Sequence, residues 1–265
     1  MEEYFTSPDL NNPIDQSVVA LTVFFTLFGG LGNVLNIPFF TRDGGLLTYS
    51  KFAKGVVLGP TVPSRVGMTL VYAPACYFGV SALGKMSSQT LWTHRTALTS
   101  AMMVAHFGKR TLECLFLHSY SGGMPLASSL FISFFYSILS VSNSHYAAFS
   151  PPLTGFPSVG FALFLVGTLG NLYHHVLLAN LRKPGETGYK VPRGGWFEYV
   201  AAPHYFFELM GHLGVAMTTQ HFVSLGMFTG MAAYLVERSM AQSAWNRKKI
   251  EDYPRDRKNI VPMLF

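Results

Sequence analysis

The feature that most constrains the fold is a series of long apolar runs separated by short polar segments. A helix needs about 20 apolar residues to cross the roughly 30 Å hydrocarbon core of a bilayer. Runs of about this length or longer occupy residues 16–40, 66–83, 97–117, 126–146, 158–181 and 200–236. The last run is too long for one crossing, and we expect it to break near residues 218–222. The chain is therefore predicted to be an all-α membrane protein, a seven-transmembrane-helix bundle.

Composition agrees with lipid as the solvent, because 49% of the residues are hydrophobic and only 12% are charged. We expect one membrane domain, residues 16–265, after a short non-cytoplasmic segment, residues 1–15. That segment is acidic at its start, whereas a signal peptide begins with basic residues, so we expect the first apolar run to remain. Cys76 and Cys114 lie in apolar runs without partner spacing, which indicates packing rather than a disulfide or a zinc site.

The positions of the basic residues predict how the bundle is oriented. All but two of the 19 Lys and Arg residues follow the first, third or fifth run or lie near the C-terminus; the exceptions are Lys85 and Arg95. The positive-inside rule then predicts an outside N-terminus and a cytoplasmic C-terminus. Although the net charge is +6, no block of five basic residues indicates a nucleic-acid partner. Membrane lipid is the expected surrounding, and nothing in the sequence indicates an oligomeric state.

One polar stretch, "NLRKPGETGYKVPRGGWFEYVAAPHYFFELM" at residues 180–210, interrupts the apolar pattern. Its cations are Arg182, Lys183, Lys190 and Arg193. Its glycines and prolines favour turns, and Tyr189 and Trp196 supply flat apolar faces. Guanidinium groups, freed backbone amides and an aromatic face together suit the pyrophosphate and rings of a dinucleotide. The alternative is that these cations only set the topology or contact lipid headgroups.

A polar stripe leads from the preceding run into this segment. With a helical period of 3.6, Asn171, His175, Leu178 and Arg182 lie along one face. Polar groups inside a membrane span usually face the bundle interior or a cavity, so the stripe indicates a cavity. The adjacent His174 and His175 point to different faces and have no ligand spacing, so we expect no metal site.

The sequence is similar at several places to a known family. "LRKPGETGYKVPRGGWFEYV" and "EDYPRDRKNIVPMLF" closely resemble the C-terminal region of the steroid 5-alpha-reductase family, whose C-terminal domain is that of 3-oxo-5-alpha-steroid 4-dehydrogenase. "TVPSRVGMTLVYAPA" and "AHFGKRTLECLFLHSYSGGMPL" resemble its plant-like branch. The resemblance runs from about residue 49 to the C-terminus, with the family motifs in about 105–265.

The resemblance implies a seven-span bundle in the endoplasmic reticulum membrane that takes NADPH from the cytoplasm. The implied reaction reduces a carbon–carbon double bond conjugated to a carbonyl, with a 3-oxo-delta-4 steroid as the expected lipid-soluble substrate. Hydride goes to the beta carbon and a proton to the alpha carbon, so the site needs donors to the carbonyl oxygen.

The family motifs also imply the cofactor-binding residues. Asn171 and Arg182 match cofactor-binding positions, and Arg238 matches a family arginine. Four positions depart from the steroid reductases: His175 replaces Asp, His204 replaces Asn, Gln242 replaces His and Asn246 replaces Tyr. The expected set for NADPH is Asn171, His175, Arg182, Lys183, Tyr189, His204, Arg238, Gln242 and Asn246.

On the catalytic side the departures are larger. Where the steroid enzymes have a Gln-Glu pair before a proline this chain has Val71 and Tyr72, and their carbonyl-binding Tyr is Phe107. "AHFGKRTLE" and "PHYFFE" instead resemble the enoyl-CoA reductases, whose catalytic Lys and Tyr correspond to Lys109 and Tyr205. We expect Tyr205 to bond the carbonyl or supply the proton, with Lys109 tuning it or fixing the cofactor, and Tyr72 as an additional donor.

Each of these roles has an alternative. Tyr205 could be an interfacial aromatic residue, Lys109 and Arg110 could mark the cytoplasmic end of a span, and Tyr72 could only pack beside Pro74. The carboxylate of Glu208, costly in lipid, is expected to pair with a cation or border the cofactor cavity. As a whole, the chain could also be a trans-2-enoyl-CoA reductase of very-long-chain fatty acid elongation, or a non-catalytic relative that binds sterol or lipid.

Overall fold

The computed structural model of the chain describes residues 5–25, 59–86, 95–120, 122–149, 156–181, 186 and 188–264. These residues form helices, one pair of short strands and the segments that connect them. The helices are α1 (Pro13–Phe25), α3 (Ser64–Gly84), α4 (Arg95–Leu112), α5 (Leu126–Tyr146), α6 (Phe156–Ala179), α7 (Pro203–Thr219) and α8 (Phe222–Lys249). A π-helical turn, Glu113–Leu117, continues α4, and 3-10 turns occupy Ala147–Phe149 and Gly195–Glu198. The strands are β1 (Thr61–Pro63) and β2 (Gly123–Pro125).

The predicted break in the last apolar run is confirmed between α7 and α8. Gln220 ends α7 in the left-handed conformation, with φ of 52°. His221 then caps α8, because the backbone N–H of Val223 donates to its Nδ1 at 3.1 Å. Helix α8 continues past the end of this apolar run, residue 236, to Lys249. Charged and amide side chains on this extension, among them Arg238 and Asn246, are buried instead of marking a solvent-exposed tail.

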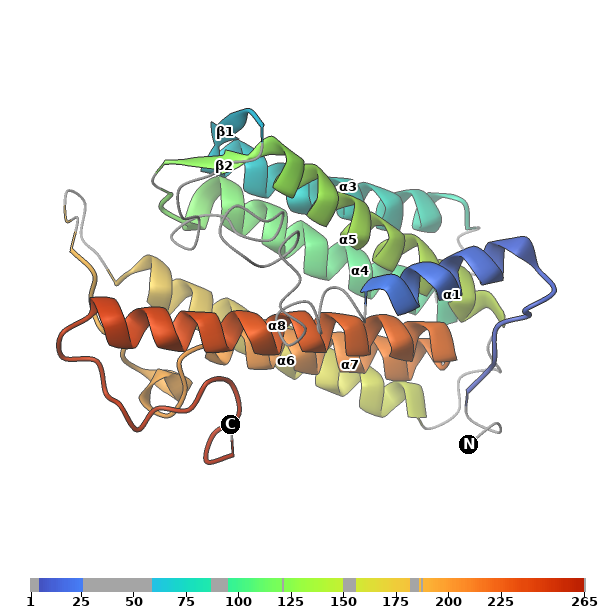
Figure 1. The fold of residues 1–265 in the computed structure, drawn as a ribbon. Coiled ribbons are helices and arrows are strands. Elements are labelled where there is room, and N and C mark those ends of the chain that lie inside the picture. The colour runs from blue at the N-terminus through green and yellow to red at the C-terminus, as the bar shows by residue number, and fades with distance from the viewer. Residues whose placement is uncertain are drawn as a thin grey trace.

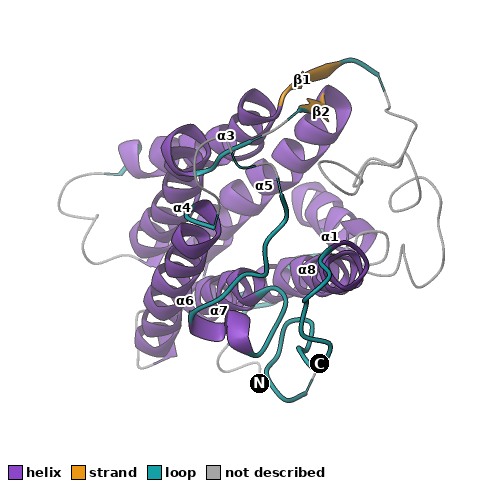
Figure 2. Ribbon diagram, turned by 90° about the vertical axis from the view of Figure 1, so that its left-hand side faces the viewer, coloured by secondary structure: helices purple, strands orange, loops and turns teal. Residues whose placement is uncertain are grey.

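The helices form two layers (Figure 1 and Figure 2). In one layer α3, α4 and α5 pack against one another, and in the other α6 packs along α7, which contacts α8. Contacts of α4 with α7 and of α5 with α8 join the layers, and α1 lies on α8. Strands β1 and β2 pair antiparallel, with Thr61 opposite Pro125. Because α3 and α5 each begin directly after one of these strands, the pair fixes their starts side by side.

Glycines allow α6 and α7 to approach closely. A Cβ atom built on Gly167 of α6 would lie 2.6 Å from the carbonyl oxygen of Phe207. A Cβ built on Gly214 of α7 would lie 2.6 Å from the backbone nitrogen of Phe164. Small residues at such crossings let backbones meet where no hydrophobic force drives helix association in lipid.

The chain is an all-α membrane protein. Three stretches of the described helices are long and apolar enough to cross a bilayer: Ser64–Gly84, Leu126–Phe149 and Pro157–Ala179. Their outward faces carry exposed apolar side chains such as Tyr77, Phe134 and Leu169. Helices α4 and α8 are less apolar because they carry buried charged residues, whose contacts form the site described next. Of the first predicted run, residues 26–40 lie outside the described part of the chain.

Candidate active site

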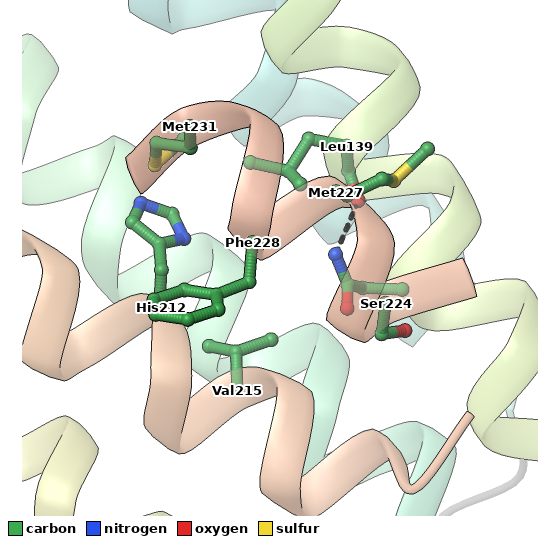
Figure 3. Close-up of a pocket in the computed structure, with 8 residues that line it drawn as sticks. Leu139, His212, Val215, Ser224, Met227, Phe228 and Met231 are labelled. Carbon is green, nitrogen blue, oxygen red and sulfur yellow. Dashed lines mark hydrogen bonds between the residues drawn. The ribbon is translucent and has the colours of Figure 1, made fainter. Parts of the chain in front are cut away.

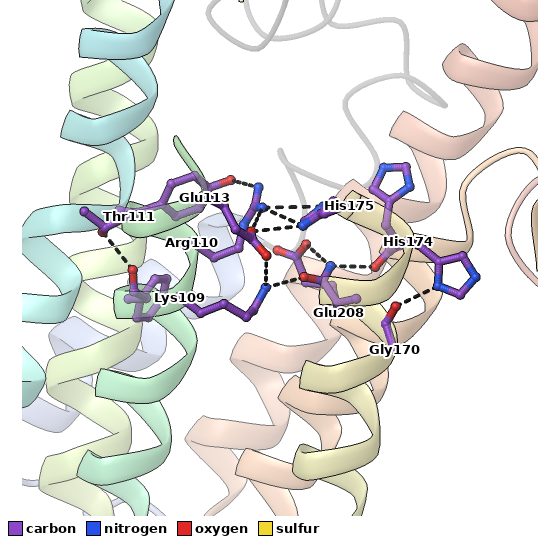
Figure 4. Close-up of polar contacts among 12 residues, drawn as sticks. Lys109, Arg110, Thr111, Glu113, Gly170, His174, His175 and Glu208 are labelled. Carbon is purple, nitrogen blue, oxygen red and sulfur yellow. Dashed lines mark hydrogen bonds and ion pairs between the residues drawn. The ribbon is translucent and has the colours of Figure 1, made fainter. Parts of the chain in front are cut away.

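A cluster of charged and polar side chains lies between α4, α6 and α7 (Figure 4). Lys109 and Arg110 occupy the last turn of α4, and Glu113 begins the π-helical turn. Residues three and four apart on a helix share a face, so both cations reach the same carboxylate. Lys109 donates to Oε1 of Glu113 at 2.9 Å, and Arg110 donates to Oε2 at 2.5 Å.

His175 of α6 joins this ion group. Its Nδ1 lies 3.0 Å from Oε2 of Glu113 and 2.9 Å from a guanidinium nitrogen of Arg110. The ring of His118 contacts the ring of His175 edge-on at 5.0 Å. The side chains of His175, Glu113 and Arg110 are buried. The polar residues of the predicted stripe that the structure describes, Asn171 and His175, therefore face the bundle interior, and the cavity inferred from the stripe stays a prediction.

Asn171, one turn earlier on α6, connects the cluster to α7. Its carboxamide oxygen accepts a 2.5 Å hydrogen bond from Lys109. Its amide donates to the carbonyl oxygen of His204 at 2.9 Å and to Glu208 at 3.3 Å. Glu208 thus contacts a predicted cofactor residue, and the two positions expected for it stay predictions.

Tyr72 of α3 is the other end of the cluster. Arg110 donates to its phenol oxygen at 2.8 Å, and the guanidinium carbon lies 4.6 Å from the ring centroid. The ring also stacks on Tyr136 of α5 at 5.5 Å. Tyr72 is therefore held by contacts with two helices, and its oxygen is directed to the polar cluster.

The two adjacent histidines of α6 point in different directions, as the sequence predicts. While His175 faces the cluster, His174 accepts a hydrogen bond at Nε2 from the backbone N–H of Trp196 at 3.1 Å. Its Nδ1 lies 2.6 Å from the carbonyl oxygen of Gly170. His174 therefore fixes the segment before α7 against α6.

Tyr205, in the first turn of α7, lies beside the cluster. It packs against the main apolar core, and its ring lies 4.3 Å from the ring of His204, whose carbonyl oxygen accepts from Asn171. The predicted catalytic residues Lys109 and Tyr72 and the predicted cofactor residues Asn171, His175 and His204 thus occupy one region, with Tyr205 adjoining it.

The remaining described cofactor candidates lie on or against α8. Arg238 and Asn246 are buried, and Gln242 donates to Oδ1 of Asn246 at 2.5 Å. The Tyr189 ring lies edge-on to Trp245 of α8 at 4.5 Å, so the segment before α7 contacts this helix. Arg182 and Lys183 lie outside the described residues.

The segment after α8, residues 250–264, holds the residues that precede α7. The backbone N–H of Ala201 donates to the carbonyl oxygen of Lys258 at 2.8 Å. Arg257 is buried and donates to the carbonyl oxygen of Pro192 at 2.9 Å and to Glu198 at 3.4 Å. This C-terminal segment therefore fixes the entry to α7.

Glu198 lies outside the helices that cross the bundle, and its carboxyl has a lowered pKa. The largest cause is the hydrogen bond from the backbone N–H of Gly194, 2.7 Å long. Arg193 at 3.2 Å and Arg257 at 3.4 Å lower the pKa further.

Two groups of His and Glu side chains in the described part of the chain have ligand atoms close enough for a metal ion. They are His106, Glu208 and His212, and Glu113, His118 and His175. Cations already occupy both oxygens of Glu113, and Asn171 donates to Glu208. The expectation of no metal site stays a prediction.

A separate pocket lies between α5, α7 and α8 (Figure 3). Apolar side chains, among them Leu139, Val215 and Met227, line most of it, with His212 at one side. It has no interior space for even a water molecule, so it does not hold a dinucleotide, and no predicted catalytic or cofactor residue lines it.

The sequence reasoning missed two members of the cluster. Arg110 was interpreted only as a marker of a span end, and Glu113 was given no role. The available signal was a carboxylate three and four residues after two adjacent cations, all within one apolar run. A charge in such a run is costly unless it is paired, so this spacing indicates a buried ion group.

Comparison with known proteins places these residues in context. The sequence model of the family described as 3-oxo-5-alpha-steroid 4-dehydrogenase matches residues 123–265. The chain is 33% identical over 210 residues to 3-oxo-5-alpha-steroid 4-dehydrogenase 1 of Macaca fascicularis, covering 77% of this chain and 80% of the relative. It is equally identical to the Homo sapiens protein of that name, covering 77% and 81%. It is 27% identical over 264 residues to steroid 5-alpha-reductase DET2 of Solanum lycopersicum, covering 95% and 98%.

Proposed function

Because this chain belongs to the 3-oxo-5-alpha-steroid 4-dehydrogenase family, we propose that it is an NADPH-dependent membrane reductase of a carbon–carbon double bond conjugated to a carbonyl. The family resemblance noted in the motifs is confirmed, its plant branch included. A 3-oxo-delta-4 steroid is the proposed substrate. The observation that carries the proposal is the cluster in which hydrogen bonds of Lys109 and Arg110 on α4 connect this helix to Asn171 on α6 and to Tyr72 on α3.

The cluster suits a reaction that develops charge on a carbonyl oxygen. Reduction of an enone places negative charge on that oxygen, and fixed donors stabilise it without reorganisation. A phenol oxygen that accepts a hydrogen bond from a guanidinium is polarised to donate more strongly through its own O–H. Tyr72, which accepts from Arg110 at 2.8 Å, is therefore a proposed donor to the carbonyl, together with Tyr205.

The described residues fit a dinucleotide in the chemistry of their side chains. Arg238, Gln242 and Asn246 place a guanidinium and two amides along α8, and Nδ2 of buried Asn246 has no hydrogen-bond partner among the described residues. Asn171 and His175 add an amide and an imidazole on α6. When bound, NADPH supplies the hydride. These residues would hold the NADPH molecule, with Tyr189 beside α8 and the basic residues Arg182 and Lys183 contributing charge.

We propose seven crossings for the whole chain, in the endoplasmic reticulum membrane. The seven helices of the described residues support this number, because their order follows the predicted runs. The distribution of Lys and Arg supports an outside N-terminus and a cytoplasmic C-terminus, which would open the region before α7 to cytoplasmic NADPH.

A trans-2-enoyl-CoA reductase is the second candidate function. Lys109 favours it, because this residue matches the enoyl-CoA reductases and lies at the centre of the cluster. Phe107, buried in the core, lacks the hydroxyl that the steroid pattern would use at this position. The two functions share one chemistry and differ in the group that carries the carbonyl.

The test is a product assay of the purified protein in detergent, with NADPH and either progesterone or a trans-2-enoyl-CoA. Reduction of progesterone supports the steroid function, and reduction of only the thioester supports the second candidate. NADPH binding is measured in parallel for Asn246→Ala and for the exposed control Lys248→Ala. A wild-type protein that neither binds NADPH nor reduces either substrate would leave a non-catalytic sterol- or lipid-binding relative and refute the proposal.

A further inference from the structure

We propose that Glu113 is a positioning residue, which aligns the groups that face the carbonyl with the groups that face the cofactor. The inference rests on the proposed function and deepens it. The partners of Glu113 described above are Lys109, Arg110 and His175, not the proposed carbonyl donors Tyr72 and Tyr205, so it acts through its neighbours. The alternative is that Glu113 is only structural: its ion pairs would then stabilise the fold, and its replacement would leave turnover per folded molecule unchanged.

The contacts of Glu113 use both of its carboxylate oxygens. Oε1 accepts from Lys109 at 2.9 Å, while Oε2 accepts from Arg110 at 2.5 Å and lies 3.0 Å from Nδ1 of His175. Only 4% of the side chain is exposed. A buried carboxylate with three fixed partners holds each of them in one geometry.

These partners lead to different parts of the proposed site. Through Arg110, Glu113 is connected to Tyr72 on α3, a proposed carbonyl donor. Through Lys109, Glu113 is connected to Asn171, and it contacts His175 directly. Both of these residues are on α6 and are proposed to hold the cofactor. Glu113 is thus the acidic group that the carbonyl side and the cofactor side share in the cluster.

The backbone at Glu113 supports a specific placement. The helix changes from α to π at this residue, and the N–H of His118 donates to the carbonyl oxygen of Glu113 at 2.9 Å. Single π-helical turns are rare and frequently occur at functional sites. Here the change begins just after the face that carries Lys109 and Arg110, so Glu113 stays in register with both cations while the following residues leave that face.

Without the carboxylate, two adjacent cations would be buried with no counter-ion between them. Lys109 and Arg110 would repel each other, and Arg110 would no longer be held between Glu113 and Tyr72. A misplacement of about 1 Å in a catalytic group costs roughly 10²-fold in rate. The expected defect is therefore in turnover more than in binding.

The experiment compares Glu113→Gln and Glu113→Asp with wild type in detergent, using whichever of progesterone or the trans-2-enoyl-CoA the wild type reduces. We expect kcat of Glu113→Gln per folded molecule to fall by roughly 10²-fold, with a smaller change in the Kd of NADPH. Glu113→Asp, which keeps the charge, is expected to recover part of kcat. If Glu113→Gln does not fold, the Asp variant alone must show the kcat defect.

The matched control is Asp15→Asn. Asp15 on α1 is also a buried acid with a tyrosine partner, since the hydroxyl of Tyr146 donates to it at 2.8 Å. Tyr146 stacks on His221, which follows the end of α7, whereas the cluster contacts His204 and Glu208 in the first half of α7. The kcat of Asp15→Asn per folded molecule should match wild type. Wild-type kcat in both Glu113 variants would overturn the inference while leaving the proposed function intact. A wild type inactive on both substrates would refute the proposed function, and the inference with it.

Discussion

Lys109 of α4 donates a 2.5 Å hydrogen bond to Asn171 of α6, a residue 62 positions later in the chain. The same ammonium group binds Glu113 at 2.9 Å. Lys109 therefore has two fixed acceptors in different elements, which a residue that only marks the end of a span does not need. The alternative role of Lys109 as a topology signal does not account for these two hydrogen bonds.

Replacing Lys109 with Met should lower turnover by roughly 10²-fold or more, the usual range for loss of an acid–base or charged group at the reacting centre. Met keeps the apolar stem and removes the ammonium. The measurement is kcat with a saturating enone and NADPH. Lys85→Met, at an exposed lysine after α3, is the matched control and should behave as wild type. Equal turnover in both variants would exclude Lys109 from the mechanism.

Replacing Tyr205 with Phe should slow turnover by roughly 10²-fold while leaving the affinity for NADPH nearly intact, because only the hydroxyl is lost. The ring contacts with His204 and the core remain. Steady-state kinetics and equilibrium cofactor binding check both parts. Tyr199, which is 61% exposed and four residues past Gly195, provides the control Tyr199→Phe. Unchanged turnover would return Tyr205 to the interfacial aromatic residues.

Replacing Gly167 with Ala should destabilise the bundle by about 3 kcal/mol, the upper end of the usual cost of overpacking. The new Cβ would lie 2.6 Å from the carbonyl oxygen of Phe207, a backbone atom that cannot rotate away. Thermal unfolding in detergent measures the loss. Gly84→Ala is the control, since nothing lies within 4 Å of a Cβ there. Similar melting temperatures for the two variants would contradict the close packing of α6 on α7.

Replacing Arg257 with Met should cost about 1.5–3 kcal/mol, the range for hydrogen bonds to charged groups. The substitution removes the side-chain donor to the carbonyl oxygen of Pro192 and one of the donors to the carboxylate of Glu198. The exposed Arg255→Met is the control. Unfolding in detergent and protease sensitivity of the segment before α7 should both change in the first variant. A shift of the same size for Arg255 would point to net charge instead.

The stabilising effect of Glu198 should depend on pH in a defined direction. Its pKa is lowered in the folded protein, chiefly by the N–H of Gly194, so its contribution is present above the ordinary Glu pKa of about 4.3 and is lost as pH falls through the lowered value. Wild type should therefore melt above Glu198→Gln at neutral pH, and the difference should vanish in acid. A difference that grows on acidification would reverse the assigned sign.

Much of the fold was predictable because lipid imposes a strict length and composition on each crossing. The runs at 66–83 and 126–146 correspond to α3 and α5 within about two residues. The break before α8 could be placed only approximately, because a left-handed Gln220 and a His221 cap leave no sequence signal such as glycine or proline. The extension of α8 to Lys249 was missed because its charges resemble a solvent-exposed tail until their burial is known.

The site was predictable where one helix carried several of its members. Asn171 and His175 share a face of α6, so a period of 3.6 indicates them together. Glu113 could not be assigned in this way, because its role depends on His175, 62 residues away in the chain, and on a π-helical turn that no residue pattern marks. The use of the His204 carbonyl oxygen is also invisible to side-chain reasoning.

The π-helical turn at Glu113–Leu117 makes this stretch tolerant of changes in chain length. A π turn holds one residue more than an α turn, so a single deletion within it can be absorbed by closing an ordinary turn. The same deletion between Arg95 and Gly108 would rotate the rest of α4 by about 100° relative to the residues before the deletion. Lys109 and Arg110 would then no longer face Asn171. Natural or engineered variants of this protein should therefore accept a single-residue deletion just past the ion cluster and reject one just before it.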